Sequence, residues 1–459
     1  MRLAARLLLV LSALTLVMAP PGQATEAEPA SASDNVRHVA NLAYELRYGQ
    51  TLPYGTDIEL LSHRGRDWAF AGTYRNGLQI IDVTNPAAPQ VAAVYDCAIA
   101  QGDVQVFTQG KRLLVGYTAD DISSQTFPES QCYRDNDITE KKYGTFFVDV
   151  TNPRKPTTAG FVEFPKGSHN QTVHPSGNYV YNSNSDLLLK SAPAIEIYDI
   201  SDLANPKHVT DLVLGTGLES HDITFNADGT RAYSAAVTHS LVIDTEDPAN
   251  PSIIGRIIDP AINIHHQSDP ITIGDRTLLV VTDELAGAAG NGFCPGGGLH
   301  IFDITGDRER VPVKVGFFDI TDVRPTTGTS ITCTSHVLRM YPEQQLMTIA
   351  WYAAGTRIID LSGLADPIPT MAEVGHAYFD DSDTWSAKSL TVTRDGTFHV
   401  FANDIERGLD VFEVTLGEGS GAKRSGRWLT AAQIAAERAA LPKTSATTDR
   451  PFCLLPVNA

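Results

Sequence analysis

Apolar residues follow one recurring pattern along the chain: a short apolar run, an acidic residue, and a turn rich in Asn and Pro. The pattern first occurs as GLQIIDVTNPAAP at residues 77–89. It returns as TFFVDVTNPRKP, AIEIYDISDLANP, SLVIDTEDPANP, GLHIFDITGDRERVP, GTRIIDLSGLADP and GLDVFEVT. Seven copies of one pattern indicate a repeat architecture.

Two further kinds of segment lie between the copies. A short alternating run follows the Pro, and a second run enters a Gly turn, as in VHPSGNYVY, FNADGTRAY and VTRDGTFHV. Ser-Gly and Asp-Gly between alternating apolar runs are hairpin signals, because Gly accepts the positive φ of those turns. Each unit of about 45 to 65 residues therefore predicts four short strands, a to d, with the recurring run as strand c.

The acidic residue that ends each c strand is expected to be structural, since a carboxylate there accepts backbone N–H groups of the following turn. These acids are Asp82, Asp149, Asp199, Asp244, Asp303 and Asp360.

The last copy indicates how the repeat closes. After GLDVFEVT the chain reads LGEGSGAKRSG, which is not a strand, whereas NVRHVANLAYEL at residues 35–46 has the length and alternation of a d strand. The N-terminal strand is therefore expected to complete the seventh unit and protect the sheet edges. The pattern predicts an all-β fold, a seven-bladed β-propeller over residues 35–415. An open solenoid or two β-sandwiches would have no use for this strand.

The two ends of the chain predict other segments. Residues 1–24 combine Arg2 and Arg6 with an apolar run and a small-residue site, which is typical of an export signal. The apolar run is short for a membrane span, so a secreted or cell-surface protein with no span after cleavage is expected, with an uncleaved anchor as the alternative. Residues 25–34 are interpreted as a loose leader. Residues 416–459 are interpreted as a linker and a short helical tail from Arg427, with Trp428, Ile434 and Leu441 on one side.

Composition narrows the classes of partner. The 459 residues are 42% hydrophobic and 19% charged, which is ordinary for a globular protein. The net charge of −19 argues against a nucleic-acid partner, because phosphate binding needs a basic surface. Five cysteines in an exported chain permit two disulfides, but their spacing alone does not fix the pairing.

The c strands LQIIDVTNPAAP, LVIDTEDPANP and RIIDLSGLADP resemble the LVIVD-repeat family of exported bacterial and archaeal proteins. The resemblance covers about residues 35 to 415 and implies a β-propeller, but no common reaction comes with it. The fourth copy lacks the Val between Asp244 and Thr245, and the last copy has Glu413 in place of Asp.

A propeller places the cysteines in two neighbouring pairs. Cys97 ends a d strand beside the long insertion that holds Cys132, and Cys333 precedes an a strand beside the insertion that holds Cys294. We therefore predict Cys97–Cys132 and Cys294–Cys333, with Cys453 unpaired.

Four histidines are predicted to begin innermost strands at one equivalent position. They are His169, His221, His266 and His336, with His265 as a substitute for His266. The other blades have Thr56, Gly102 and Lys388 there. Imidazoles at the channel mouth suit a transition metal ion. Protonated, they would hold an anion, and a role as strand caps is the structural alternative. Because the inner strands diverge, two or three of the four converge more easily than all.

Residues at the exits of the b strands are expected to line the same funnel: Tyr117, Asn184, Asp283, Trp351, Tyr352, Asn403 and Asp404. With Lys388, we take Trp351, Asp404 and Asp283 as ligand-binding candidates. The long insertions, near residues 117–144 and 283–298, are predicted to emerge on this face, where loops tend to carry function.

These observations leave two functional hypotheses. The first is an exported scaffold that binds an unknown small molecule, glycan or protein through the histidine-bearing face. The alternative is a metal-dependent enzyme, oxidase- or lactonase-like, that uses the histidines. The sequence has no GxSxG, P-loop or HExxH motif, which favours the first. Four aligned histidines favour the second.

Overall fold

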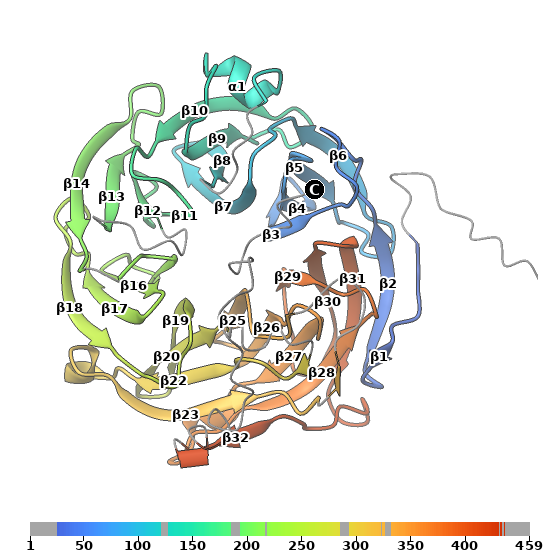
Figure 1. Ribbon diagram of the computed structural model, residues 1–459. Coiled ribbons are helices and arrows are strands. Elements are labelled where there is room, and N and C mark those ends of the chain that lie inside the picture. Colours follow the sequence, from blue (N-terminus) through green and yellow to red (C-terminus); the bar gives the residue numbers. More distant parts are fainter. Residues whose placement is uncertain are drawn as a thin grey trace, which may run out of the picture.

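The chain forms a closed ring of seven antiparallel sheets around one axis, as the computed structural model shows (Figure 1). The described residues are 25–120, 127–184, 193–215, 218–284, 293–322, 324–325, 332–430, 432–433 and 436. The prediction of an all-β, seven-bladed propeller is confirmed. The predicted signal peptide, Cys453, Ile434 and Leu441 lie outside the described residues.

Blades 1 to 4 each contain four consecutive strands, a to d, from the axis outward. Blade 1 consists of β3 (Gly55–His63), β4 (Arg66–Thr73), β5 (Leu78–Asp82) and β6 (Gln90–Tyr95). Blade 2 consists of β7 (Gln101–Gln109), β8 (Arg112–Ala119), β9 (Gly144–Asp149) and β10 (Thr157–Glu163). Blade 3 consists of β11 (Asn170–Val173), β12 (Tyr179–Ser183), β13 (Ala194–Asp199) and β14 (Lys207–Val213). Blade 4 consists of β15 (Asp222–Phe225), β16 (Arg231–Ala236), β17 (His239–Asp244) and β18 (Ser252–Ile257).

Blades 5 to 7 complete the ring and carry small additions. Blade 5 consists of β19 (His265–Ile273), β20 (Arg276–Asp283), β22 (Leu299–Asp303) and β23 (Val313–Asp319). Blade 6 consists of β25 (Leu338–Tyr341), β26 (Leu346–Ala350), β27 (Thr356–Asp360) and β28 (Ala372–Tyr378). Blade 7 consists of β29 (Thr384–Lys388), β30 (Gly396–Asp404), β31 (Gly408–Leu416) and β2 (Val36–Leu42). The short elements are α1 (Gln131–Asp135), η1 (Gly306–Glu309), η2 (Ser362–Ala365), β21 (Phe293–Cys294) and β24 (Arg324–Pro325).

The N-terminal strand closes the ring as predicted. β2 pairs antiparallel with β31, from Val36 opposite Val414 to Leu42 opposite Leu409. The segment before it is not wholly loose: β1 (Ser31–Ala32) pairs with the outer strand β28 of blade 6. The segment from Ser31 to Leu42 therefore connects the last two blades, so the closure involves two sheets.

The acids at the ends of the c strands have the structural role that the sequence predicts. In blades 1 to 6 the carboxylate accepts the backbone N–H of the residue two positions later, for example Asp149 from Thr151 at 2.9 Å and Asp360 from Ser362 at 2.9 Å. The equivalent bonds reach Asp82, Asp199, Asp244 and Asp303. These bonds provide acceptors for backbone N–H groups in the turns, which have no partner in the paired strands.

The apolar core lies between neighbouring blades. Phe70 of blade 1 packs in one cluster with Val115 and Phe146 of blade 2, and Phe147 of blade 2 packs with Val180 of blade 3. Each sheet therefore buries both faces, which explains why the c strands are continuous apolar runs.

The C-terminal segment begins as a strand, and the predicted helix is wrong for its first residues. β32 (Arg427–Leu429) pairs with β23 and forms a fifth strand on blade 5. The indole of Trp428 lies over Gly316, where an added Cβ would meet ring atom Cζ2 at 1.4 Å. This contact needs a residue without a side chain on a neighbouring strand, and local helical spacing does not reveal it.

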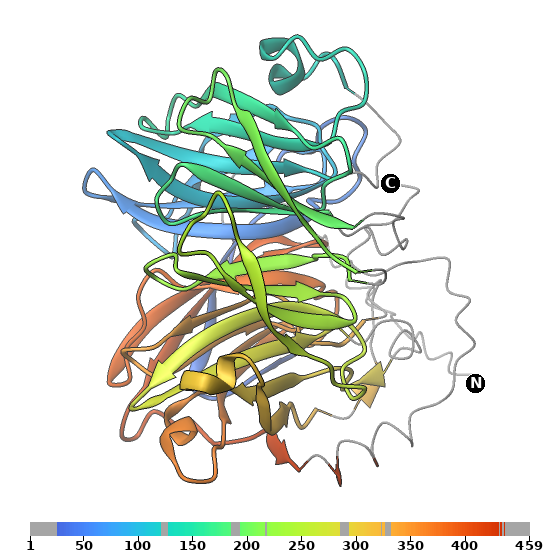
Figure 2. The ribbon, with the colours of Figure 1, turned by 90° about the vertical axis from the view of Figure 1, so that its left-hand side faces the viewer.

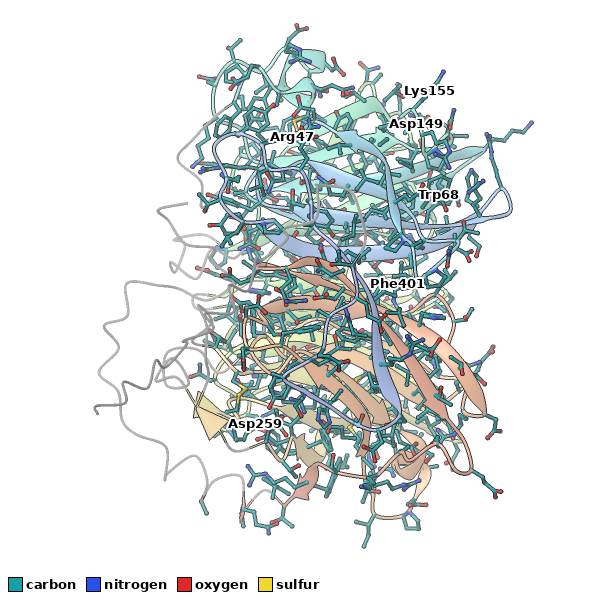
Figure 3. The ribbon with its side chains drawn as sticks, turned by 90° about the vertical axis from the view of Figure 1, so that its right-hand side faces the viewer. Arg47, Trp68, Asp149, Lys155, Asp259 and Phe401 are labelled. Atoms are coloured by element: carbon teal, nitrogen blue, oxygen red, sulfur yellow. A yellow bond between two sulfur atoms is a disulfide. The ribbon has the colours of Figure 1, made fainter. Side chains whose placement is uncertain are left out.

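The connections divide between two faces of the disc (Figures 2 and 3). Figure 3 shows Arg47 and Asp259, both in d–a connections, on one face, which we call the loop face. Trp68, at the start of a b strand, and Asp149 and Lys155, at a c–d turn, lie toward the opposite turn face.

Both predicted disulfides are confirmed. Cys97–Cys132 and Cys294–Cys333 join residues whose Cα atoms are 5.1 and 5.2 Å apart. Each bridge joins a long insertion to a neighbouring d–a connection, which precedes the insertion of blade 2 and follows that of blade 5. Within the described residues, the helices are too short or too polar to span a membrane.

Candidate functional site

The four predicted histidines form one continuous row near the axis. Neighbouring ring centroids are 4.2 Å apart for His169 and His221, 4.4 Å for His221 and His266, and 4.2 Å for His266 and His336. All four residues are at least 93% buried, since the most exposed, His169, has 7% relative exposure. The row follows the order of blades 3 to 6, so the alignment of these residues in the sequence corresponds to contact in space.

The same backbone bond positions three members of the row. The N–H groups of His169, His221 and His336 each donate to the last residues of the adjacent b strand, at 2.8, 2.7 and 3.0 Å. His266 of blade 5 is positioned differently, because the pairing of β19 with β20 shifts in register between His265 and Ser268. His265 contacts the hydroxyl of Ser240 through Nδ1 at 2.8 Å, which leaves His266 as the member of the row.

Lys388 does not occupy the equivalent position in blade 7, and this part of the alignment is wrong. Ala387 pairs with Ala402 as Leu338 of blade 6 pairs with Ile349, so Trp385 is the counterpart of His336. The indole of Trp385 lies 4.7 Å from the imidazole of His336, and its backbone carbonyl accepts the Nδ1–H of His336 at 2.6 Å. The proton on Nδ1 leaves Nε2 of the neutral ring as an electron-pair donor.

Two buried carboxylates, those of Asp120 and Glu284, lie beside the row of imidazoles, and neither was predicted from the sequence. Asp120 Oδ2 accepts a hydrogen bond from Nδ1 of His169 at 2.6 Å. Glu284 lies between two imidazoles, 3.9 Å from Nε2 of His266 and 4.0 Å from Nε2 of His336. The phenol of Tyr352 donates to Glu284 at 2.8 Å and its ring lies 4.4 Å from that of His336.

Three ligand-binding candidates from the sequence do not face the cavity. Trp351 is packed in the apolar cluster that contains both cysteines of the second disulfide. Asp283 accepts the backbone N–H groups of Asn263 and Ile264, and Asp404 accepts those of Asp383, Glu406 and Arg407. Each lies one residue before a residue beside the histidine row or in the cluster around Trp385, as Asp283 precedes Glu284 and Trp351 precedes Tyr352. Along a strand this shift of one reverses the direction of the side chain.

The other funnel residues predicted at the b-strand exits also make structural contacts. The phenol of Tyr117 donates to the carbonyl of Thr73, and the amide of Asn403 donates to those of Asp57 and Gly72. Asn184 is fully buried and does not line the cavity.

Burial favours the neutral form of three of the imidazoles, those of His221, His266 and His336. Removal from water, followed by the charges of neighbouring imidazoles, holds the pKa of His221 and of His266 well below the ordinary value. Burial also lowers the pKa of His336 to about 3, although its bond to the Trp385 carbonyl acts in the opposite direction. Neutral imidazole is the form that donates to a metal ion.

One group in the row has the spacing of a metal site. Single donor atoms of His221, His266 and Glu284 all lie within 4.8 Å of one another, and all three residues are buried. Metal–nitrogen bonds of about 2.1 Å place adjacent donors of one ion roughly 3 to 4 Å apart, so small side-chain rotations would bring these atoms to one ion. Two imidazoles and a carboxylate suit transition ions such as Zn, Fe or Cu.

A large cavity extends from the histidines along the a strands. Its volume is about 1340 Å³, and its wall runs from His169, His221, His266, His336 and Trp385 to residues near the turn face such as Thr108 and Asn226. The histidines therefore line the inner, buried end of an axial cavity. The sequence pattern had placed them at an open mouth of the channel on the loop face, whereas in the structure they are buried. The volume is sufficient for a small molecule.

The a strands add two layers of polar side chains to this wall. One residue after the histidine position they place Asp57, Asp103, Asn170, Asp222 and Gln267. Three residues after it they place Glu59, Thr224, Asp269, Arg339 and Lys388. Lys388 thus lines the cavity, as expected of a ligand-binding candidate, but in a deeper layer than predicted.

Comparison with known proteins gives a family signature and the fold. The sequence profile of the LVIVD repeat matches residues 66–97, which span β4 to β6 of blade 1. No curated protein sequence matches the chain.

Three solved structures are similar to this chain. The Swd1 β-propeller domain of Myceliophteria thermophila is 11% identical with a TM-score of 0.50, covering 79% of this chain and 96% of that one. A functionally unknown protein from Desulfotomaculum acetoxidans is 13% identical with a TM-score of 0.46, covering 71% and 89%. The periplasmic gluconolactonase of Pseudomonas aeruginosa is 10% identical with a TM-score of 0.47, covering 78% and 98%.

At these identities the likeness concerns the fold alone. Blade 1 carries the LVIVD-repeat signature and the chain forms a ring of seven blades, which is consistent with the β-propellers of the LVIVD-repeat family.

Proposed function

We propose that this protein is exported, binds a transition metal ion at its axial histidines, and uses the ion to bind a small molecule in the axial cavity. The observation that carries the proposal is the convergence of His221, His266 and Glu284 within 4.8 Å at the inner end of the cavity. The disulfides Cys97–Cys132 and Cys294–Cys333 support export, because such bonds persist in oxidising compartments.

The arrangement of the donors supports an open metal site. Two imidazoles and one carboxylate leave coordination positions for water or for an atom of a ligand, as in catalytic zinc sites. His336 adds a further imidazole 4.2 Å from that of His266, with its Nε2 on the side of Glu284. His169 is the end member of the row, and its ring centroid lies 4.2 Å from that of His221, so it lies at the edge of the site.

A metal-dependent enzyme is the second candidate, and one contact favours it. Tyr352 and Glu284 form a hydrogen bond of 2.8 Å directly beside the imidazoles. A phenol and a carboxylate in this position are able to exchange a proton with a ligand whose oxygen is polarised by a bound metal ion. This arrangement does not select between oxidation and hydrolysis.

A scaffold role for the loop face, the first hypothesis from the sequence, is a separate proposal. Its support is that both disulfides tie long insertions to neighbouring connections on that face. Such ties hold the described ends of the insertions, at Cys132 and Cys294, which suits a surface that binds a partner.

Elemental analysis of the purified exported protein tests the metal proposal. We expect roughly one equivalent of a transition metal in the wild type, and loss of it in His221→Ala and His266→Ala. His208→Ala is the matched control, because that imidazole is exposed and pairs with Asp211 on the outer strand β14. A wild type that contains no metal and gains no thermal stability from Zn, Cu or Fe would contradict the proposal and leave the histidines with a structural role.

A further inference from the structure

The carboxylate of Glu284 presents its two oxygens to two different imidazoles. Oε2 lies 3.9 Å from Nε2 of His266, whereas Oε1 lies 4.0 Å from Nε2 of His336. Both distances are within the span of one ion, because two donors that each lie about 2.1 Å from an ion are at most roughly 4.2 Å apart. One carboxylate is therefore placed to donate to two ions, one at each oxygen.

His336 lies outside the group of donors on which the proposed function rests. Single donor atoms of His221, His266 and Glu284 lie within 4.8 Å of one another, and His336 does not belong to this group. An ion bound by those three residues would use the Glu284 oxygen on the side of His266. The other oxygen and the imidazole of His336 are then placed for a second ion.

The imidazole of His336 is oriented as in a metal ligand. Its Nδ1–H donates to the backbone carbonyl of Trp385 at 2.6 Å, and the indole of Trp385 packs against the ring with centroids 4.7 Å apart. A carbonyl that accepts from one ring nitrogen fixes the tautomer and the direction of the ring, as is usual for metal-ligating histidines. Nε2 is then the donor atom, and this is the nitrogen on the side of Oε1 of Glu284.

Tyr352 supplies a third donor at the same carboxylate oxygen. Its phenol oxygen lies 2.8 Å from Oε1 of Glu284, and its ring lies 4.4 Å from that of His336. All three side chains are removed from water, with relative exposures of 0% for His336 and Glu284 and 4% for Tyr352. Imidazole and carboxylate suit Cu and Fe, and deprotonated tyrosine is an iron ligand in some haem proteins. The three donors therefore form a set for a transition ion that accepts phenolate.

We propose that His336, Tyr352 and Oε1 of Glu284 bind a second transition metal ion, so that Glu284 bridges two ions. The inference rests on the proposed function for the first ion, with which the second shares Glu284. Ions in two-metal sites lie about 3.5–4 Å apart, a separation that a carboxylate is able to bridge. The second ion binds more weakly, because two cations at this separation repel each other. Purified protein therefore holds about one equivalent and takes up the second when metal is added.

Titration with Cu(II) after dialysis against a chelator tests the inference, followed by electron paramagnetic resonance and visible absorption. The first equivalent should give the signal of an isolated Cu(II) ion. The second should lower the integrated signal per copper, because two ions that share a carboxylate couple magnetically, and should add a phenolate-to-copper charge-transfer band. His336→Ala should bind one equivalent and keep the isolated signal.

Tyr352→Phe is the milder variant, since it keeps the aromatic ring and removes only the phenol oxygen. We expect it to abolish the charge-transfer band and weaken the second equivalent about tenfold or more, with the first equivalent unchanged. Tyr74→Phe is the matched control. Tyr74 belongs to the same aromatic cluster, but its phenol accepts a hydrogen bond from Arg75 at 2.9 Å. The thermal midpoint of each variant confirms that it is folded.

An isolated signal that does not change beyond one equivalent would overturn the inference, and so would coupling that persists in His336→Ala. A single equivalent that is lost in His221→Ala and kept in His336→Ala would contradict this inference and leave the proposed function standing. Copper that is kept in His221→Ala and His266→Ala but lost in His336→Ala would contradict the first site and support the second. No bound copper in the wild type would contradict both.

Discussion

The residues around the inner end of the axial cavity form two halves with different chemistry. Across blades 3 to 6 the half-ring consists of imidazoles with Asp120 and Glu284 beside them. Across blades 6, 7 and 1 the same level is filled by an apolar cluster: Tyr54, Tyr74, Ala100, Tyr352, Trp385 and Ile405. The two halves share one backbone position in blade 7, since Trp385 stands where blades 3 to 6 have histidine.

The difference indicates that the aromatic half stabilises the fold, whereas the histidine half is suited to binding. The aromatic half removes apolar area from water, which stabilises the ring by about 25 cal/mol per Å². The histidine half removes imidazoles and carboxylates from water, which costs free energy, as the lowered pKa values of His221 and His266 show. A repeat that needed only to close its axis would gain more from aromatics in every blade. The polar half is therefore the part of the ring with a use beyond folding.

The largest effect on the free energy of unfolding is expected from a substitution in the aromatic half. Trp385→Ala should destabilise the protein by about 3–5 kcal/mol, because it leaves a cavity between Tyr352 and His336. The midpoint of urea unfolding measures the change, with metal content measured beside it. Metal should be retained, since the carbonyl that orients His336 belongs to the backbone and is unchanged. Trp428→Ala, on the added outer strand, should cost less. Loss of metal with no loss of stability would contradict the division between the halves.

The two disulfides allow the two halves of the ring to be compared separately, because one lies next to the aromatic half and the other next to the histidine half. Cys97 precedes Ala100 of the aromatic cluster, whereas Cys333 precedes His336. Replacing either pair by serine should destabilise the protein by about 2–4 kcal/mol, seen as a lower thermal midpoint. Only Cys294→Ser/Cys333→Ser should also weaken metal binding, as measured by titration with a competing chelator. Equal metal affinity in both double variants would show that the connection before His336 does not position the imidazole.

Much of this arrangement follows from the sequence, because repeats make positions comparable. The c strands, their terminal acids, the closing strand and both disulfides were predictable, since each depends on the order of strands within a unit. The row of His169, His221, His266 and His336 was predictable for the same reason: a shared offset from a turn corresponds to a shared level along the axis.

The residues that were not predicted correctly are those whose role depends on the direction of the side chain, which the order of strands within a blade does not determine. Asp283 and Glu284 are neighbours at the end of β20, and only the exact end of the strand decides which one faces the axis. Blade 7 has no histidine to fix its alignment, so Lys388 was placed where Trp385 lies. The strand at Arg427–Leu429 depends on the contact of Trp428 with Gly316, and tertiary contact overrides local helical spacing there.

The smallest of these effects concerns the outermost histidine. Asp120 Oδ2 lies 2.6 Å from Nδ1 of His169 and fixes the orientation of the ring, which leaves Nε2 as the atom that could bind a metal ion. If His169 contributes to the metal site, Asp120→Asn should weaken metal binding about 10–100-fold, the usual effect of removing a carboxylate that orients a ligating imidazole. Glu284→Gln should have a larger effect, because Glu284 supplies a donor atom itself. Asp275→Asn, at an exposed turn, is the control. Unchanged affinity in Asp120→Asn, together with loss in Glu284→Gln, would restrict the metal site to blades 4 to 6 and leave His169 as the last structural residue of the row.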